Sequence, residues 1–182
     1  LKVSFARPHS PYDPPQRFLD LYADRTLPAP ATGDWDSTFS TRYTHEPSRN
    51  PEAPYGDFGA EYAQQARKYY AANVSFIDEQ VGRIVAALKA RGLYDNSVIL
   101  FVSDHGDMLG DHHHWRKTYA YEGSAHVPFI VRYPAGMRAR VRRGAVRDEV
   151  VEIRDILPTF LDAAGAAIPE GVDGRSILEL IR

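Results

Sequence analysis

The hydrophobic and polar positions of this chain change period along its length, and each period predicts a different element. Residues 98–102 (VILFV) form an unbroken apolar run, which indicates a strand covered on both faces, as in a parallel or mixed sheet between helices. Residues 127–133 (VPFIVRY) predict a second strand. From residue 57 to residue 91, apolar side chains recur at spacings of three and four, which predicts a long helix. The pattern as a whole predicts an α/β chain.

The predicted long helix has recognisable ends. Asp57 is placed to cap its first turn, and Gly92 is placed to end it, after a basic last turn. The apolar face is expected to consist of Tyr70, Val74, Ile77, Val81, Ile84 or Val85, and Leu88. Such a helix is expected to cover a sheet and to lead through a short turn into the strand at residues 98–102.

Shorter patterns predict strands at residues 1–6 and 146–151 and helices at residues 16–24 and 155–164. Asp155 is expected to cap the last of these helices and Gly165 to end it. Residues 27–57 are rich in Pro, Gly, Ser, Thr and Asn, which predicts a long irregular excursion of the kind that often carries function.

Candidate chemistry begins where the apolar strand ends. Asp104 and His105 follow residues 98–102 almost at once, and ligands in α/β sheets bind beyond the carboxyl ends of strands. Carboxylate oxygen and neutral imidazole nitrogen are both metal ligands. The next residue, Gly106, permits a close backbone approach or a positive φ. The alternative for the pair is a loop cap beside a surface histidine.

A second candidate is His9, which lies at the end of the predicted strand 1–6. Prolines surround it in the segment Arg-Pro-His-Ser-Pro, and proline fixes φ and removes a backbone donor. We therefore expect His9 to sit in a stiff, non-helical loop. From the loop alone, an ordinary loop histidine is the competing interpretation.

Composition narrows the classes of function. The chain is 43% hydrophobic and 25% charged, with a net charge of -2, so no overall field favours nucleic acid or an anionic membrane. No apolar run reaches the roughly 20 residues of a membrane helix. Arg138, Arg140, Arg142, Arg143 and Arg147 form a basic cluster, but acidic neighbours offset it and no aromatic side chains interleave. The absence of cysteine excludes disulfides and thiolate metal sites within these residues.

Residues 102–134, VSDHGDMLGDHHHWRKTYAYEGSAHVPFIVRYP, resemble the second signature region of the type I sulfatases of the alkaline phosphatase superfamily. The resemblance extends from about residue 3 to residue 177. It implies an alkaline-phosphatase-like α/β fold with a mostly parallel or mixed sheet between helices. Residues 1–182 would form a single partial domain, the later portion of a catalytic domain. The nucleophile-bearing half and the C-terminal subdomain would belong to the remainder of the polypeptide.

The resemblance assigns roles to particular side chains. Asp104 and His105 match the later pair of metal ligands in the family, and Lys117 matches a lysine that reaches the sulfate oxygens. His9 matches a histidine that contacts the sulfate or the leaving-group oxygen. Among the three consecutive histidines, His113 is the expected substrate contact. The acidic side chains of Asp107, Asp111 and Glu122 are expected to act as loop caps and hydrogen-bond anchors.

The same resemblance implies cofactors and a reaction. Sulfatases use a divalent metal, with Ca²⁺ as the first expectation and Mn²⁺ as the alternative, since imidazole suits Mn²⁺ or Zn²⁺ better than Ca²⁺. They also use a formylglycine nucleophile, whose C/S-x-P-S-R motif does not occur in this sequence. The expected substrate is a small-molecule or glycan sulfate ester, hydrolysed by the full-length protein and not by this chain alone.

Two other functions stay open at this stage. One is a phosphonate monoester or phosphodiester hydrolase of the same superfamily, because the Asp-His form of the metal pair also occurs there. The other is a non-catalytic α/β module that binds a metal or an anion. No nucleic-acid or membrane partner is expected, and a periplasmic or secreted location would suit the family.

Overall fold

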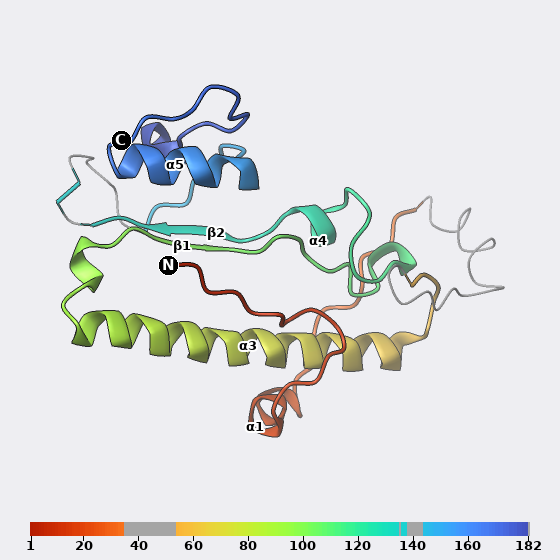
Figure 1. Ribbon diagram of the computed structural model, residues 1–182. Coiled ribbons are helices and arrows are strands. Elements are labelled where there is room, and N and C mark those ends of the chain that lie inside the picture. The colour runs from red at the N-terminus through yellow and green to blue at the C-terminus, as the bar shows by residue number, and fades with distance from the viewer. Residues whose placement is uncertain (35–53, 135, 138–143, 182) are drawn as a thin grey trace. The chain divides into compact units, whose positions relative to one another are not determined.

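A computed structural model of the protein describes residues 1–34, 54–134, 136–137 and 144–181 (Figure 1). Its longer elements are α1 (Gln16–Leu19), α3 (Ala60–Ala90), β1 (Ile99–Val102), α4 (Glu122–Ala125), β2 (Phe129–Arg132) and α5 (Ile156–Ala163). Its 3₁₀ helices are η1 (Asp20–Tyr22), η2 (Tyr94–Asn96), η3 (Asp111–His113), η4 (Ile153–Asp155) and η5 (Ile177–Ile181). The chain divides into two compact units, Leu1–Ala87 with His105–Pro128, and Leu88–Asp104 with Phe129–Arg182.

Helix α3 has the ends that its sequence predicts. Asp57 Oδ1 accepts the N–H of Gly59 at 2.8 Å, and the helix begins immediately after this turn. At the other end Gly92 adopts φ 67°, and the Leu93 N–H donates to the Leu88 carbonyl at 3.0 Å. A left-handed glycine with this hydrogen bond is a common way to close a helix. The predicted helix is therefore confirmed to within a few residues at each end.

The buried face of α3 differs from the predicted face at one position, Val74. Asn73 is fully buried at 0% exposure, whereas Val74, which was predicted to face inward, is 45% exposed. Most of the other buried positions of α3 are alanines: Ala63, Ala66 and Ala72, together with Ile77. Small side chains let neighbouring segments approach the helix closely, so size, and not hydrophobicity alone, sets which face is buried.

The short helices α1 and η1 are fastened along α3, beside which α1 lies in Figure 1. Arg17 donates two hydrogen bonds to the Glu79 carboxylate, at 2.6 and 2.7 Å, in the fork geometry that suits guanidinium. The Phe18 ring packs against Phe76 with centroids 5.5 Å apart. The helix predicted at residues 16–24 is confirmed over residues 16–22 by α1 and η1. The two contacts hold this segment, which follows the loop of His9, against α3.

In the second unit, β1 and β2 form a two-stranded antiparallel sheet. The register pairs Ile99 with Arg132 and Val102 with Phe129. The α/β class is confirmed, and both strands lie where the sequence predicts them. The pairing is compatible with the mixed form of the predicted sheet; parallel neighbours are not among the described strands.

Helix α5 is held to the turn that follows it by one buried carboxylate. Asp155, which is 4% exposed, accepts the N–H of Glu152 and of Arg175 at 2.9 Å each. Gly174 fits in this turn because a Cβ there would lie 2.0 Å from the Arg154 carbonyl oxygen. Asp155 stands at the N-cap position of α5, as predicted, but its carboxylate makes no cap hydrogen bond to that helix and instead completes the capping box of η4 with Glu152. Gly165 ends α5 at φ 68°.

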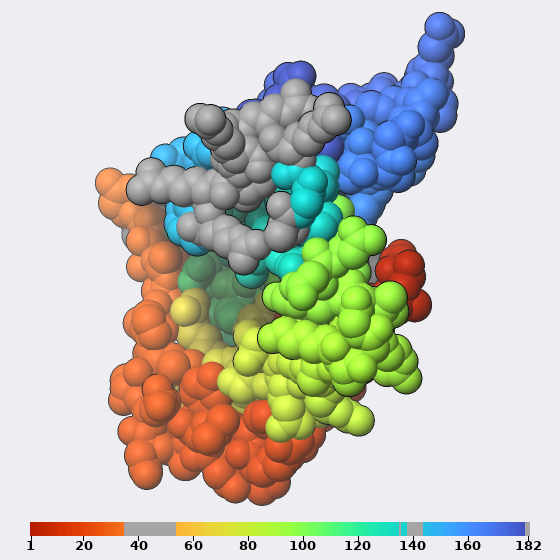
Figure 2. Space-filling view, turned by 90° about the vertical axis from the view of Figure 1, so that its left-hand side faces the viewer, coloured from red at the N-terminus to blue at the C-terminus, as the bar shows by residue number. Residues whose placement is uncertain are grey.

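Two predicted strands are wrong. Residues 1–6 and 146–151 contain no strand, and no described segment pairs with either of them. Val3 is 50% exposed and Val146 is 89% exposed, and the N-terminal end lies at the surface in Figure 2. Alternation alone does not make a strand without a neighbour to complete its hydrogen bonds. Most of the 27–57 excursion and of the arginine cluster lies outside the described residues.

Candidate active site

An ion pair between two residues of the same loop, Arg7 and Asp13, closes the loop that carries His9. Arg7 donates to Asp13 Oδ2 at 2.8 Å, and this hydrogen bond holds the pKa of Asp13 below its ordinary value. The His9 Nδ1 atom lies 2.7 Å from the Ser10 carbonyl oxygen. A carbonyl can only accept, so Nδ1 carries the proton, and in the neutral ring Nε2 holds the lone pair.

Lys117 is the hydrogen-bond partner of His9 Nε2. Its Nζ lies 2.8 Å from His9 Nε2, and both side chains are half-buried. An ammonium has only donors, so Lys117 donates and the imidazole accepts. The structure thus brings together the two side chains that the resemblance assigns to sulfate binding.

Asp107 holds the residue that precedes Lys117. Its Oδ1 accepts the N–H of Arg116 at 2.8 Å and of Leu109 at 3.0 Å, and its Oδ2 accepts the Tyr12 hydroxyl at 2.7 Å. A further backbone hydrogen bond of 2.7 Å joins Met108 N–H to the Arg116 carbonyl. Asp107 is therefore an internal anchor of this loop, as its sequence position predicts.

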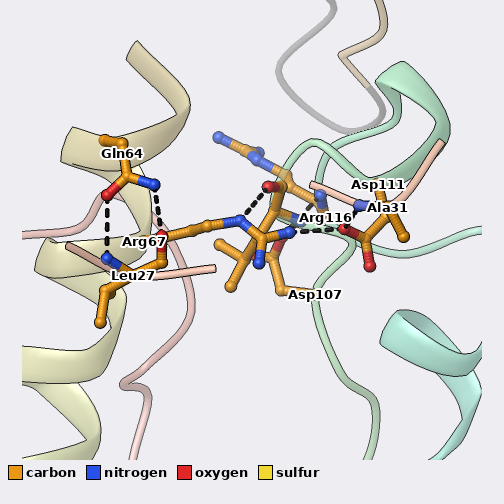
Figure 3. Close-up of polar contacts among 8 residues, drawn as sticks. Leu27, Ala31, Gln64, Arg67, Asp107, Asp111 and Arg116 are labelled. Carbon is orange, nitrogen blue, oxygen red and sulfur yellow. Dashed lines mark hydrogen bonds and ion pairs between the residues drawn. The ribbon is translucent and has the colours of Figure 1, made fainter. Parts of the chain in front are cut away.

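Arg67 of α3 braces the other end of the loop (Figure 3). It donates to Asp111 Oδ1 at 2.5 Å and to the Leu109 carbonyl at 3.1 Å. Asp111 Oδ1 also accepts the Ala31 N–H at 2.9 Å. The Arg67 and Asp111 side chains are only 15% and 26% exposed, which reduces the solvent screening that weakens surface ion pairs. Arg67 thus holds residues 109–111 of the loop, while Asp107 joins the start of the loop to Arg116.

Left-handed backbone is concentrated in this loop. Positive φ angles occur at Leu109, His112, His113, Arg116 and Thr118. A non-glycine residue in this region costs roughly 1 to 3 kcal/mol, and such strain is typically stored at functional sites. The anchors at Asp107 and Asp111 supply the interactions that hold the backbone in this shape.

His105 lies beside the His9–Lys117 pair. The rings of His105 and His9 are 5.7 Å apart between centroids and nearly perpendicular. The His105 Nδ1 atom is 2.7 Å from the Gly106 carbonyl oxygen, so it donates there and Nε2 is left as the basic nitrogen. A Cβ on Gly106 would lie 2.1 Å from the Gly123 carbonyl oxygen, which confirms the predicted close approach.

The donor chemistry of the predicted metal pair suits a divalent cation, but the pair is not a complete set. A backbone acceptor on Nδ1 is the usual arrangement for a histidine that binds metal through Nε2. Asp104 is exposed and directly precedes His105. Across the residues that the structure describes, no three His, Cys, Asp or Glu side chains come together to hold a metal. The cation would need ligands beyond Asp104 and His105.

The three consecutive histidines have separate surroundings. The His114 ring stacks on Tyr119 at 4.0 Å, and the His112 ring contacts Tyr121 at 4.9 Å. His113 joins the segment before α3 through its carbonyl, which accepts the Gly56 N–H at 2.8 Å. The substrate contact predicted for His113 stays a prediction.

Sequence reasoning missed two residues that shape this site, Tyr12 and Arg67. Tyr12 reads as one more residue of a proline-rich loop, and Arg67 reads as a solvated helix position. Burial, and next the negative charge of Asp107, raise the pKa of Tyr12 well above its ordinary value, so its hydroxyl stays a donor. Both residues act on partners far along the chain, and no local pattern indicates such partners.

Comparison with known proteins identifies the family of the chain. The family model of the sulfatases matches residues 1–166. An arylsulfatase of Clostridium perfringens is 44% identical over 100% of this chain and 37% of its own length. A choline-sulfatase of Rhizobium meliloti is 32% identical over 100% of this chain and 35% of its own length. The chain belongs to the sulfatase family.

Solved structures show the same fold. The phosphonate monoester hydrolase of Agrobacterium radiobacter has a TM-score of 0.82 at 27% identity, covering 98% of this chain and 37% of that one. The phosphonate monoester hydrolase of Silicibacter pomeroyi has a TM-score of 0.78 at 34% identity, covering 96% of this chain and 35% of that one. These neighbours confirm the alkaline-phosphatase-like α/β fold.

The chain spans little more than a third of the length of these relatives. The described part of the chain has no helix both long and apolar enough to cross a membrane.

Proposed function

We propose that this chain is part of a sulfuric ester hydrolase, and that the contact between His9 and Lys117 marks the position of the sulfate. The observation that carries the proposal is the 2.8 Å separation of Lys117 Nζ and His9 Nε2 in a half-buried setting. A fixed ammonium beside an imidazole suits a tetrahedral oxyanion, because it supplies charge and donors without reorganisation.

Each side chain has its own task in this proposal. Lys117 turns its N–H donors from His9 to the sulfuryl oxygens and offsets the charge that grows on them during ester cleavage. His9 Nε2 is then released and takes up a proton from solvent, and the imidazolium donates that proton to the ester oxygen that leaves. The hydrogen bond from Nδ1 to Ser10 keeps the ring oriented throughout.

Asp104 and His105 are proposed to bind the divalent cation of the family through a carboxylate oxygen and Nε2. When bound, the cation withdraws charge from the sulfuryl group as a Lewis acid. Ca²⁺ is the proposed ion and Mn²⁺ the alternative, since an imidazole ligand favours the latter. The remaining ligands and the formylglycine nucleophile would come from the remainder of the polypeptide. The proposed substrates are small aryl sulfates, by analogy with the 44% identical arylsulfatase.

A second candidate activity is phosphonate monoester hydrolysis. It is supported by the TM-scores of 0.82 and 0.78 to two phosphonate monoester hydrolases. A phosphonate monoester presents a tetrahedral anion that Lys117 and His9 can bind in the same way. The two activities differ in the reacting centre and not in the residues of this chain.

The deciding experiment compares esters that share one leaving group. The natural-length protein that contains residues 1–182 is assayed with 4-nitrophenyl sulfate, 4-nitrophenyl phosphate and 4-nitrophenyl phenylphosphonate. We expect the largest kcat/KM for the sulfate. A clear preference for the phosphonate ester would replace the sulfatase proposal by the second candidate, and no hydrolysis of any of the three would remove both.

A further inference from the structure

One carboxylate joins the two loops that carry the proposed sulfate-binding side chains. Asp107 accepts the Tyr12 hydroxyl on one oxygen and the Arg116 N–H on the other, at 2.7 and 2.8 Å. Tyr12 lies in the loop of His9, and Arg116 directly precedes Lys117. Since successive Cα atoms are about 3.8 Å apart, an anchor so near in sequence leaves each loop little freedom.

The hydrogen bonds of Asp107 come from rigid partners. The Tyr12 ring lies edge-on to Tyr70 of α3, with ring centroids 6.0 Å apart, and packs against the core formed by Ala63, Ala66 and Trp115. Arg116 is additionally tied to Met108, which is 1% exposed. A contact between two fixed groups transmits position, whereas a contact between mobile groups would not.

The donors to Asp107 also keep their protonation state. Burial raises the pKa of the Tyr12 phenol and the adjacent carboxylate raises it further, so the phenol stays neutral and donates. The remaining donors are backbone N–H groups of Leu109 and Arg116, which do not titrate. These hydrogen bonds therefore do not depend on the ionisation of their donors.

We propose that Asp107 is a positioning residue for the sulfate site, which sets the separation of His9 and Lys117 by holding Tyr12 and the Arg116 backbone on its two oxygens. The inference rests on the proposed function, in which those two side chains bind the anion. It differs from a purely structural role, because the loss of Asp107 should act through Lys117 and not only through the stability of the fold.

A matched control is present in the same loop. Asp111 is also a partly buried carboxylate with a backbone donor and a side-chain donor, Ala31 and Arg67. Neither partner neighbours His9 or Lys117 in sequence. Asp107→Asn and Asp111→Asn thus remove the same charge from the same loop. Only the first weakens the hydrogen bonds that connect the two sulfate-binding loops.

The test measures kcat/KM and thermal unfolding in the natural-length protein, with whichever 4-nitrophenyl ester the wild type hydrolyses. Asp107→Asn is expected to lower kcat/KM about 30-fold and Tyr12→Phe about 10-fold, because a misplacement of about 1 Å can cost about 100-fold in rate. Asp111→Asn is expected to lower the unfolding temperature and to lower kcat/KM clearly less than Asp107→Asn does, by about 3-fold, because its partners adjoin neither His9 nor Lys117. Tyr12→Phe keeps the test open if Asp107→Asn fails to fold.

A double-mutant cycle with Lys117→Ala separates positioning from stability. In the Lys117→Ala background, Asp107→Asn should change kcat/KM by less than about 3-fold, since no His9–Lys117 separation is left for Asp107 to set. Equal effects in both backgrounds, or a loss of unfolding temperature without a loss of kcat/KM, would overturn the proposal.

The result can be told apart from a failure of the proposed function. If the wild type hydrolyses none of the esters, that function fails, and binding of inorganic sulfate measured by calorimetry becomes the readout. Asp107→Asn should then weaken sulfate binding about 10-fold or more relative to Asp111→Asn, because Lys117 and His9 would no longer be held at the separation that the anion needs. Equal binding by the two variants, or no binding by the wild type, counts against the inference.

Discussion

Lys117 donates a hydrogen bond of 2.8 Å to His9 Nε2, although 108 positions separate the two residues in the sequence. Each is placed by contacts close to it in its own loop. The Arg7–Asp13 pair closes the loop of His9, and Asp107 holds the residue before Lys117. The two side chains therefore meet only because the chain folds, and substitution of either one is the most direct test of the proposed site.

Lys117→Ala is expected to lower kcat/KM by about 100-fold to 1,000-fold, the range seen when a fixed donor to a transition-state oxyanion is removed. His9→Ala should have a smaller effect on esters with a good leaving group, because such a group needs less help from a proton donor. Steady-state kinetics with 4-nitrophenyl and phenyl esters measures both effects. Lys89→Ala, at the end of α3, is the control cation. An equal loss in Lys89→Ala would contradict the assignment of Lys117.

Gly106→Ala should destabilise the protein, because its Cβ would meet the Gly123 carbonyl oxygen at 2.1 Å. Overpacking of this kind costs about 1 to 3 kcal/mol, and the backbone partner cannot rotate away. Gly82→Ala is the matched control, since its Cβ meets nothing within 4 Å on α3. The control should gain about 0.5 to 1 kcal/mol from helix propensity. Urea unfolding measures both changes, and the same sign for the two variants would contradict the predicted close contact.

Stability should fall at alkaline pH. Burial raises the pKa of Tyr70 and of Tyr133 from 10.0 to about 12. The unfolded chain loses these protons near pH 10, so the folded state binds more protons between pH 10 and about 12. The stabilising contribution is complete below pH 10 and is lost as the pH rises through this window.

Tyr133→Phe isolates one part of the alkaline effect. The buried Tyr133 hydroxyl has no hydrogen-bond partner in the described part of the chain, so the variant should be as stable as the wild type near neutral pH. Above pH 10 its unfolding free energy should decline less steeply than that of the wild type. Urea titrations across this range measure the two slopes, and identical slopes would show that the phenol does not contribute.

The 182-residue chain alone should bind Ca²⁺ and Mn²⁺ only weakly, with a dissociation constant above about 1 mM. Asp104 and His105 supply two ligands, and these cations take about six or more. Isothermal calorimetry on wild type and His105→Ala measures the difference. Tight stoichiometric binding that His105→Ala abolishes would instead indicate a self-sufficient metal module.

The sequence predicts those parts of this protein that depend on local pattern. Helix α3 and strands β1 and β2 follow from apolar periodicity, and Gly92 and Gly165 end their helices as expected. On the predicted apolar face of α3, Ile77 is buried but Val74 is exposed, and Asn73 is buried beside it, because hydrophobicity does not report the space available for close packing.

The candidate site was predictable in part. Family resemblance indicates His9, Lys117 and His105, and these three side chains lie near one another in the structure. Tyr12 and Arg67 could not be found in this way. Tyr12 acts on a partner 95 positions away and Arg67 on one 44 positions away, and each looks unremarkable beside its sequence neighbours. Tertiary contacts alone reveal their roles.

The left-handed residues between positions 109 and 118 bear on how this protein would respond to directed evolution. Arg116 and Thr118 adopt φ of 66° and 105°. Glycine adopts such positive φ values without strain, whereas a residue with a Cβ does not. Selection for heat tolerance is therefore expected to return glycine or asparagine at these positions. Selection for turnover should disfavour the same changes, because a more flexible backbone on either side of Lys117 would leave its ammonium less precisely positioned.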